Sequence, residues 1–422
     1  MAALPAVASP VLAQEVPATS AADAPEFDAV AAWDEFEQLL RSEYAYIERD
    51  DIDVEAQLRR SRALAAEAGD RKALRRIMHR TGLTFMDPHL LVGPFDDDDY
   101  AILMSSADLD ACFEDGRAVI VDVRRGSPAF DAGLRPGDEI VSIAGLPARD
   151  AARAPFGTVL PDPSDAQFDY GLTLAVNGLR TGNRLLSVRS AEAPVREVQL
   201  GSTRDWANGL ADRELVELSF AGAAGDIAVL RPLNSLGDND TITAFDAALE
   251  KAIADGARGV VLDMRETPSG GNTEVGRSVI GHFVDAPRPY QMHRVPVLER
   301  EFTVPRQFVE YVFPREPLFK GPVVVLHGRW TGSMGEGIVI GMDAASAATT
   351  IGSNMGDLLG GVWNAQLELS GARVDFGGES LFHPDGTPRE DYVADIPTEP
   401  ASTAADGSDP ALAAALELLE AR

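Results

Sequence analysis

Residues 321–337 read GPVVVLHGRWTGSMGEG, and this stretch predicts a buried strand, a glycine-flanked turn and the start of a helix. The strand is the apolar run 321–326, and the apolar, helix-like run begins at Ile338. Ser333 stands on the turn between them. Such a turn projects a hydroxyl from the edge of a sheet, and the following N–H groups point outward with the helix dipole behind them. Ser333 is therefore either a nucleophile or an ordinary helix N-cap.

A second strand and turn lie earlier in the chain, at residues 261–272, which read VLDMRETPSGGN. Its glycines, Gly270 and Gly271, let backbone N–H groups approach a reacting carbonyl closely. One of these N–H groups could complete an oxyanion hole with that of Met334. The alternative is a tight turn with no catalytic role. The glycine spacing of both turns fits neither G-x-G-x-x-G nor a Walker loop, which excludes nucleotide binding.

Strand-like and helical patterns alternate in the second half of the chain. Residues 226–230, 259–264 and 321–326 are strand-like, and residues 240–254 have a helical pattern. Alternation of this length predicts crossover units and a mainly parallel sheet. The fold class expected for this part is therefore α/β.

The first half contains a different motif, V-x-x-G-S-P-A-x-x-A-G-L-x-x-G-D-x-I, at residues 123–140. It resembles the most recognisable half of a PDZ domain, whose remainder is expected to extend to about residue 200. The resemblance implies binding of a peptide terminus by strand addition. The alternative is a PDZ-shaped spacer that binds nothing.

The N-terminal part is expected to form a small helical domain. Apolar residues recur every three or four positions between 27 and 47, and two further amphipathic runs follow. The last helix should end near Asp87 and Pro88, because the residue before a proline is pushed out of the helical region. Residues 1–24 resemble a secretory signal without its basic n-region, so we expect either a periplasmic or secreted protein, or a disordered tail.

The composition excludes several classes of protein. The 422 residues include 37 Lys and Arg against 67 Asp and Glu, a net charge of −30 that argues against a nucleic-acid partner. Cys112 is the single cysteine and the six histidines lack metal-binding spacing, so no metal site is expected. After the first segment, no apolar stretch is long enough to span a bilayer.

Taken together, these motifs resemble the C-terminal processing (tail-specific) serine peptidases and their tricorn-core and retinoid-binding relatives. The matching pieces, besides the PDZ motif, are LDMRETPSGGN, GRWTGSMGEG and GTPREDYVADIPTEP. The resemblance implies a crotonase/ClpP-like α/β catalytic domain, an N-terminal helical domain and an inserted PDZ domain. The expected divisions are a tail at 1–24, the helical domain at 25–100, the PDZ domain at 105–200, the catalytic domain at 213–400, and a tail with a helix at 401–422.

The resemblance also implies how the serine is activated. One subgroup uses a downstream lysine, but position 358 is Leu358 and no lysine follows Lys320. The tricorn-like subgroup uses a histidine before the PDZ domain and a glutamate in the closing segment, which correspond to His89 and Glu390. Ser333 would then attack a peptide carbonyl, His89 would accept and return the proton, and Glu390 would orient the imidazole.

Two alternatives stay open at this point. Glu336 could replace Glu390 as the third member, although its place three residues along the helix from Ser333 better suits support of the turn or contact with substrate. The expected function is a serine endopeptidase that needs no cofactor and acts on polypeptides. The substrate is either a C-terminus, which the PDZ domain would bind, or an unfolded segment admitted past that domain. The rival is a catalytically silent peptide- or lipid-binding protein on the same fold. The oligomeric state stays unknown.

Overall fold

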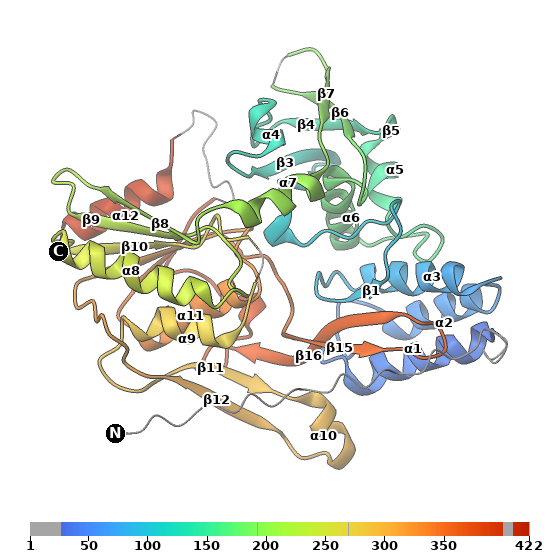
Figure 1. The fold of residues 1–422 in the computed structure, drawn as a ribbon. Helices are drawn as coiled ribbons and strands as arrows, with labels where there is room; N and C mark the ends of the chain where they lie inside the picture. Colours follow the sequence, from blue (N-terminus) through green and yellow to red (C-terminus); the bar gives the residue numbers. More distant parts are fainter. Residues whose placement is uncertain (1–26, 192, 269, 400–407, 422) are drawn as a thin grey trace, which may run out of the picture.

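The computed structural model describes residues 27–191, 193–268, 270–399 and 408–421. The signal-like segment 1–24 and the beginning of the predicted C-terminal tail lie outside these residues. A helical unit, a β-rich module and a larger α/β unit surround a common centre (Figure 1). Among the described residues, no helix combines the length and the apolar character needed to cross a membrane.

Three helices form the N-terminal unit: α1 (Ala29–Glu43), α2 (Val54–Ala65) and α3 (Arg71–Leu83). An aspartate caps each helix, because Asp28, Asp53 and Asp70 all accept hydrogen bonds from first-turn N–H groups. The apolar faces of these helices share one core with strands from the far end of the chain, including Val374 and Phe376. The sequence predicted the helices but not the strands that complete their core.

The β-rich module contains a five-stranded path in the order β2-β3-β4-β6-β7, with β5 paired to β4. Its helices cover the sheet, and its core is separate from that of the N-terminal unit. The residues between β5 and β6 form two helices, α5 and α6. The elements are β2 (Leu109–Glu114), β3 (Arg117–Val123), α4 (Pro128–Asp131), β4 (Glu139–Ile143), β5 (Leu146–Pro147), α5 (Ala148–Arg153), α6 (Asp165–Asn177), β6 (Arg184–Arg189) and β7 (Arg196–Leu200).

The α/β unit is built on a six-stranded sheet in the order β17-β14-β13-β10-β9-β8. All neighbouring pairs are parallel except β8 with β9, which confirms the predicted, mainly parallel sheet. The strands are β8 (Val216–Ala221), β9 (Ile227–Pro232), β10 (Gly259–Asp263), β13 (Val323–His327), β14 (Thr349–Gly352) and β17 (Ile396–Pro397).

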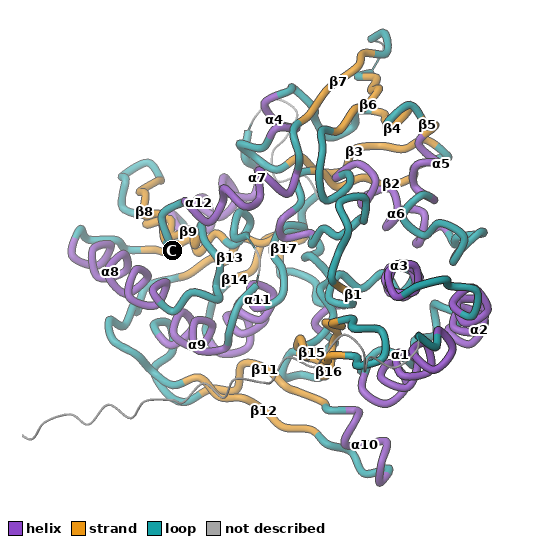
Figure 2. Tube along the Cα trace, turned by 45° about the vertical axis from the view of Figure 1, so that its right-hand side comes forward, coloured by secondary structure: helices purple, strands orange, loops and turns teal. Residues whose placement is uncertain are grey.

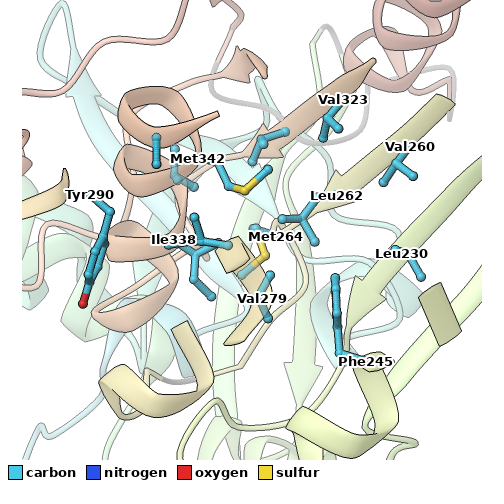
Figure 3. Close-up of a cluster of buried hydrophobic side chains, with 14 of the residues drawn as sticks. Leu230, Phe245, Val260, Leu262, Met264, Val279, Tyr290, Val323, Ile338 and Met342 are labelled. Carbon is cyan, nitrogen blue, oxygen red and sulfur yellow. The ribbon is translucent and has the colours of Figure 1, made fainter. Parts of the chain in front are cut away.

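Helices cover both faces of this sheet. One face packs on α8 (Asp240–Ala254), α9 (Thr273–Gly281) and α11 (Met334–Ala345), and Figure 3 shows this core around Leu262 and Ile338. The other face packs on α12 (Pro410–Glu420) through Ala415 and Leu419. Strands buried on both faces are continuous apolar runs, which is why β10 and β13 could be predicted from sequence.

A third sheet joins the α/β unit to the N-terminal helices, in the order β1-β16-β11-β12 with β15 paired to β16. In Figure 2, β11 and β12 extend away from the central sheet toward α10. The elements are β1 (Leu91–Gly93), β11 (Arg288–Arg294), α10 (Pro296–Phe302), β12 (Gln307–Val312), β15 (Gly361–Gln366) and β16 (Arg373–Phe382). Short helices complete the fold: η1 (Met104–Ser106), α7 (Thr203–Gly209), η2 (Leu210–Asp212) and η3 (Arg389–Asp391).

Candidate active site

Ser333 lies on the turn that connects β13 to α11, directly before the first residue of the helix. Its backbone has φ 53° and ψ −114°, a conformation that a residue with a side chain rarely adopts. Two contacts hold the turn: the Glu336 carboxylate accepts the Ser333 N–H at 2.7 Å, and the Thr331 hydroxyl donates to the Met264 carbonyl at 3.1 Å. Strain of this kind is typical of sites where a side chain must be presented in one orientation.

Gly270 lies directly against this turn. A Cβ atom at position 270 would come within 2.6 Å of the Ser333 hydroxyl oxygen and 3.1 Å of the Met334 nitrogen. Only glycine fits there, so the backbone of Gly270 lies directly against the Ser333 side chain and close to the Met334 nitrogen.

Gly271 has a different neighbour. A Cβ atom at position 271 would come within 1.9 Å of the Leu236 carbonyl carbon, and the two residues form an isolated parallel bridge. The structure therefore explains Gly271 by close packing of two backbone segments. Of the two glycines considered for the oxyanion hole, it is Gly270 that lies against Ser333.

His89 is 6% exposed and lies after α3, in the segment that leads into β1. Its Nδ1 atom is 3.0 Å from the carbonyl oxygen of Leu359. Because a carbonyl can only accept, Nδ1 must carry the hydrogen, and in the neutral ring Nε2 is then the atom able to accept a proton. Burial lowers the pKa of His89 to about 4, with the charge of Arg389 adding to this effect. The imidazole is therefore a neutral base at pH 7.

Asp87, which was not among the residues predicted from sequence, holds the backbone of His89 next to that of Leu359. One carboxylate oxygen accepts the His89 N–H at 2.9 Å and the Leu359 N–H at 3.3 Å, and the other accepts the Tyr44 hydroxyl at 3.0 Å. Burial raises the pKa of Asp87 to about 6, although these hydrogen bonds oppose the rise. The available signal was an aspartate two residues before the histidine, a spacing suited to a local side chain to backbone bond.

Arg389 connects the turn that carries Ser333 to the segment that holds His89. Its guanidinium donates to the carbonyls of Ser333 (3.3 Å), Leu358 and Gly360 (3.1 Å) and pairs with Glu336 at 3.3 Å. Both side chains of the pair are almost completely buried. Leu358 precedes the residue whose carbonyl binds the imidazole, so one arginine links the backbone of Ser333 to the segment that contacts His89.

Glu336 completes this connection from the opposite side. Besides the Ser333 N–H and Arg389, its carboxylate accepts the Leu358 N–H at 3.4 Å. Burial raises the pKa of Glu336 to about 7, and the charge of Arg389 opposes the rise. Glu336 thus supports the turn, as one of the two roles considered for it from sequence requires.

Glu390 makes no direct polar contact with the imidazole in the part of the chain that this structure describes. The single hydrogen on Nδ1 of His89 goes to the Leu359 carbonyl, and no hydrogen bond or ion pair joins Glu390 to His89 within the described residues. Glu390 lies in η3 beside Arg389, where burial raises its pKa, and its charge helps to raise the pKa of Tyr46. In this structure the Leu359 carbonyl takes the Nδ1 hydrogen, and the role of Glu390 in orienting the imidazole stays a prediction.

A cavity of about 680 Å³ lies beside the histidine, between the β-rich module and the α/β unit. Its wall includes Pro88, which precedes His89, and Asp357, which precedes Leu358. Arg329 crosses this boundary, because it pairs with Asp110 of β2 at 3.2 Å and with Asp357 at 2.5 Å. Neither Ser333 nor His89 is among the described residues that line this cavity.

The comparisons with known proteins agree with this architecture. Residues 226–396 match the model of peptidase family S41, and residues 119–154 match that of the PDZ domain. No curated protein sequence matches the chain.

Solved structures with 13 to 16% sequence identity share the fold. Mature CPAF complexed with lactacystin has a TM-score of 0.61 and 14% identity, over 93% of this chain and 97% of that chain. The photosystem II D1 C-terminal processing protease has a TM-score of 0.56 and 16% identity, over 93% and 98%. A putative peptidase from Parabacteroides merdae has a TM-score of 0.55 and 13% identity, over 93% and 97%.

Proposed function

Because residues 226–396 form a peptidase family S41 domain, which makes the chain a serine-type peptidase, we propose that Ser333 is its nucleophile and His89 its general base. The observation that carries the proposal is the hydrogen bond from Nδ1 of His89 to Leu359, since it leaves Nε2 as the proton acceptor. The proposed substrate is an unfolded polypeptide.

The proposed reaction has two stages. The Ser333 oxygen attacks the scissile carbonyl while Nε2 of His89 removes its proton, and the backbone N–H of Met334, with the backbone at Gly270, stabilises the oxyanion. His89 then donates the proton to the leaving amine, and water hydrolyses the acyl-enzyme with the same base. Hydrolysis of casein by the protein, and its loss in Ser333→Ala, tests this assignment.

We propose that the buried pair Arg389–Glu336 positions these two groups, in the role first assigned to Glu390. Removing Arg389 leaves the carbonyls of Leu358 and Gly360 without their donor, and the segment that carries Leu359 then loses its attachment to the serine turn. Small misplacements of reacting groups cost about 10²-fold in rate.

Arg389→Met is therefore expected to lower kcat by about 10²-fold with little change in KM, and Arg389→Lys by less, because lysine restores the charge but not the planar fork. The matched control is Glu390→Gln on the next residue, which should retain activity within a few-fold. Steady-state kinetics on casein-derived peptides and circular dichroism of each variant make the comparison. A larger loss in Glu390→Gln than in Arg389→Met would return the positioning role to Glu390.

The pH dependence of kcat/KM should show a final loss from His89 on acidification, preceded by partial losses from the two buried carboxylates, Glu336 near pH 7 and Asp87 near pH 6. Glu336, whose pKa burial raises to about 7, becomes protonated first and weakens its pair with Arg389, which causes a partial loss of activity. His89 is neutral above its lowered pKa of about 4, so it stays an active base until the pH falls through that value. Below it, activity should fall by about tenfold per pH unit, because only the neutral imidazole accepts a proton.

The variant Glu336→Gln isolates the contribution of Glu336. It cannot titrate, so the loss near pH 7 should disappear while the loss near pH 4 remains. In Arg389→Met the upper step should move to higher pH, because the charge that lowers the pKa of Glu336 is gone. Brief pH jumps with initial-rate measurements keep acid unfolding out of the profile. A single loss near pH 6.5, the usual value for histidine, would contradict the buried base.

A further inference from the structure

Strand β2 is the edge strand of the PDZ-like sheet that borders the cavity, since Asp110, Ala111 and Cys112 line it. A PDZ domain binds a peptide by adding it as a strand to an exposed sheet edge, where unpaired N–H and C=O groups give the affinity. Whether this chain can do so depends on what β2 already binds. Figure 2 places α6 alongside β2, and the two elements are in contact.

Helix α6 occupies the hydrogen-bonding groups of that edge. Three polar side chains spaced four residues apart, Asp169, Thr173 and Asn177, lie on one face of the helix. The carboxylate of Asp169 accepts the Phe113 N–H at 2.7 Å, and the hydroxyl of Thr173 donates to the Ala111 carbonyl at 3.0 Å. The amide of Asn177 donates to the Leu109 carbonyl at 2.8 Å, and the Ala111 N–H lies 3.4 Å from the hydroxyl of Thr173. The pattern matches what an added strand would offer.

The main-chain N–H groups at the beginning of β2 also have a partner on α6. The side-chain oxygen of Asn177 accepts the N–H groups of Asp108, at 3.1 Å, and Leu109, at 3.4 Å. A terminal carboxylate captured by consecutive backbone N–H groups would need this place. The neighbouring carboxylate of Asp108 is fully buried and paired with Arg184 at 2.7 and 2.8 Å. A peptide carboxylate brought here would find both N–H groups already bonded to Asn177. It would also find Arg184 already paired with Asp108.

Contacts on its other sides hold α6 in place. A Cβ atom at Gly171 would come within 2.1 Å of the Ala152 carbonyl, so the helix packs against α5 at backbone distance. The Gln167 side chain donates to the Thr84 carbonyl at 3.0 Å, which anchors α6 to the N-terminal unit. The Thr203 hydroxyl donates to the Asn177 carbonyl at 2.8 Å, which anchors its end. Separating α6 from β2 would break contacts to three parts of the chain.

We infer that the β2 edge of this PDZ domain is closed by its own helix, and that the peptidase takes internal segments of unfolded polypeptide rather than selecting a free C-terminus. The second half of this inference rests on the proposed function. The PDZ domain then forms one wall of the cavity that Pro88 also lines. The ion pair between Arg329 and Asp110 holds the PDZ domain to the α/β unit.

Hydrogen exchange measured by mass spectrometry on the full-length Ser333→Ala protein tests the closed edge without relying on catalysis. The amides of residues 108–114 should exchange slowly in the free protein and show no added protection with saturating casein. Asn177→Ala should speed exchange in this segment, and the matched control Asn208→Ala, at an exposed asparagine of α7, should not. Fast exchange in the free protein, or protection on adding casein, would overturn the inference.

Peptide binding gives a second test that does not depend on how well Asn177→Ala folds. A fluorescent twelve-residue peptide with an apolar end is titrated into Ser333→Ala as the free acid and as the C-terminal amide. The two dissociation constants should agree within about twofold, whereas a terminal carboxylate held by its own site would add a charge-assisted contact worth at least tenfold. Tenfold tighter binding of the free acid would overturn the inference.

The substrate class is tested with the active protein. A disordered polypeptide with a free C-terminus and the same segment placed between two folded domains should be cleaved at rates within about twofold. Preference of tenfold or more for the free end would overturn the inference and leave the proposed function standing. Failure to cleave either substrate would contradict the proposed function, and the exchange and binding tests would still decide whether the edge is closed.

Discussion

Replacing Ser333 with alanine should lower the hydrolysis of casein by about 10⁴-fold or more, which is the size of loss found when a catalytic serine is removed from its triad. The substitution deletes one oxygen atom. The Glu336 carboxylate binds the backbone N–H of residue 333 rather than its side chain, so the turn keeps that contact. The thermal midpoint should therefore stay within a few degrees, because surface and site substitutions of this size change stability little. Fluorescent-casein hydrolysis and a calorimetric scan measure the two quantities.

The matched control is Ser346→Ala, at the other end of helix α11. Its hydroxyl contacts the Met342 carbonyl and the Ala348 N–H, so its removal tests whether loss of any serine from this helix reduces activity. We expect activity close to that of the unchanged protein. Full activity in Ser333→Ala would assign the nucleophile to another residue and leave only the fold.

Replacing His89 with alanine should lower kcat/KM by a comparable factor, about 10⁴-fold, since a serine hydroxyl is a weak nucleophile without its base. The loss should be mainly in kcat, because His89 exchanges protons during the reaction and contributes little to binding. Pro88, the residue before His89, lines the cavity, and added imidazole that enters the vacated position should restore part of the activity. Rescue should increase as the imidazole becomes neutral, above a pH of about 7.

His383→Ala is the control for this substitution. His383 lies beyond β16 and pairs with Asp385, and its side chain is 13% exposed. Its loss should leave kcat within a few-fold, and imidazole should have no effect. Unchanged activity in His89→Ala would exclude the histidine as base, whereas loss without rescue, together with an altered circular dichroism spectrum, would indicate a structural role only.

Signals local in sequence predicted much of the fold and part of the site. The apolar runs of β10 and β13, the glycine turn at Gly270 and the turn at Ser333 are short segments whose conformation depends mainly on neighbouring residues. The PDZ motif is local in the same sense. The peptidase model matches the part of the chain that contains the two turns, and the PDZ model matches the part that contains the motif. The helical stripes of α1 to α3 follow from spacing alone.

Contacts between distant segments determined the rest. The bond between His89 and the Leu359 carbonyl joins residues 270 positions apart, and a backbone carbonyl has no sequence signature. The contacts of Arg389 are to three carbonyls, which any residue type could supply, so the sequence carries no signal for them. The polar ladder on α6 resembles an ordinary hydrophilic helix face until β2 is placed beside it.

The amino-acid sequence by itself determined the units of the fold, the serine on its strained turn and a histidine before the PDZ-like motif. Only the tertiary structure decided which ring nitrogen of that histidine meets a carbonyl, and which groups bind the main chain of the β2 edge. The physical reason is that hydrogen-bond donors and acceptors of the main chain are the same at every position. Which partner each main-chain group binds is therefore determined by which segments pack together in the folded chain.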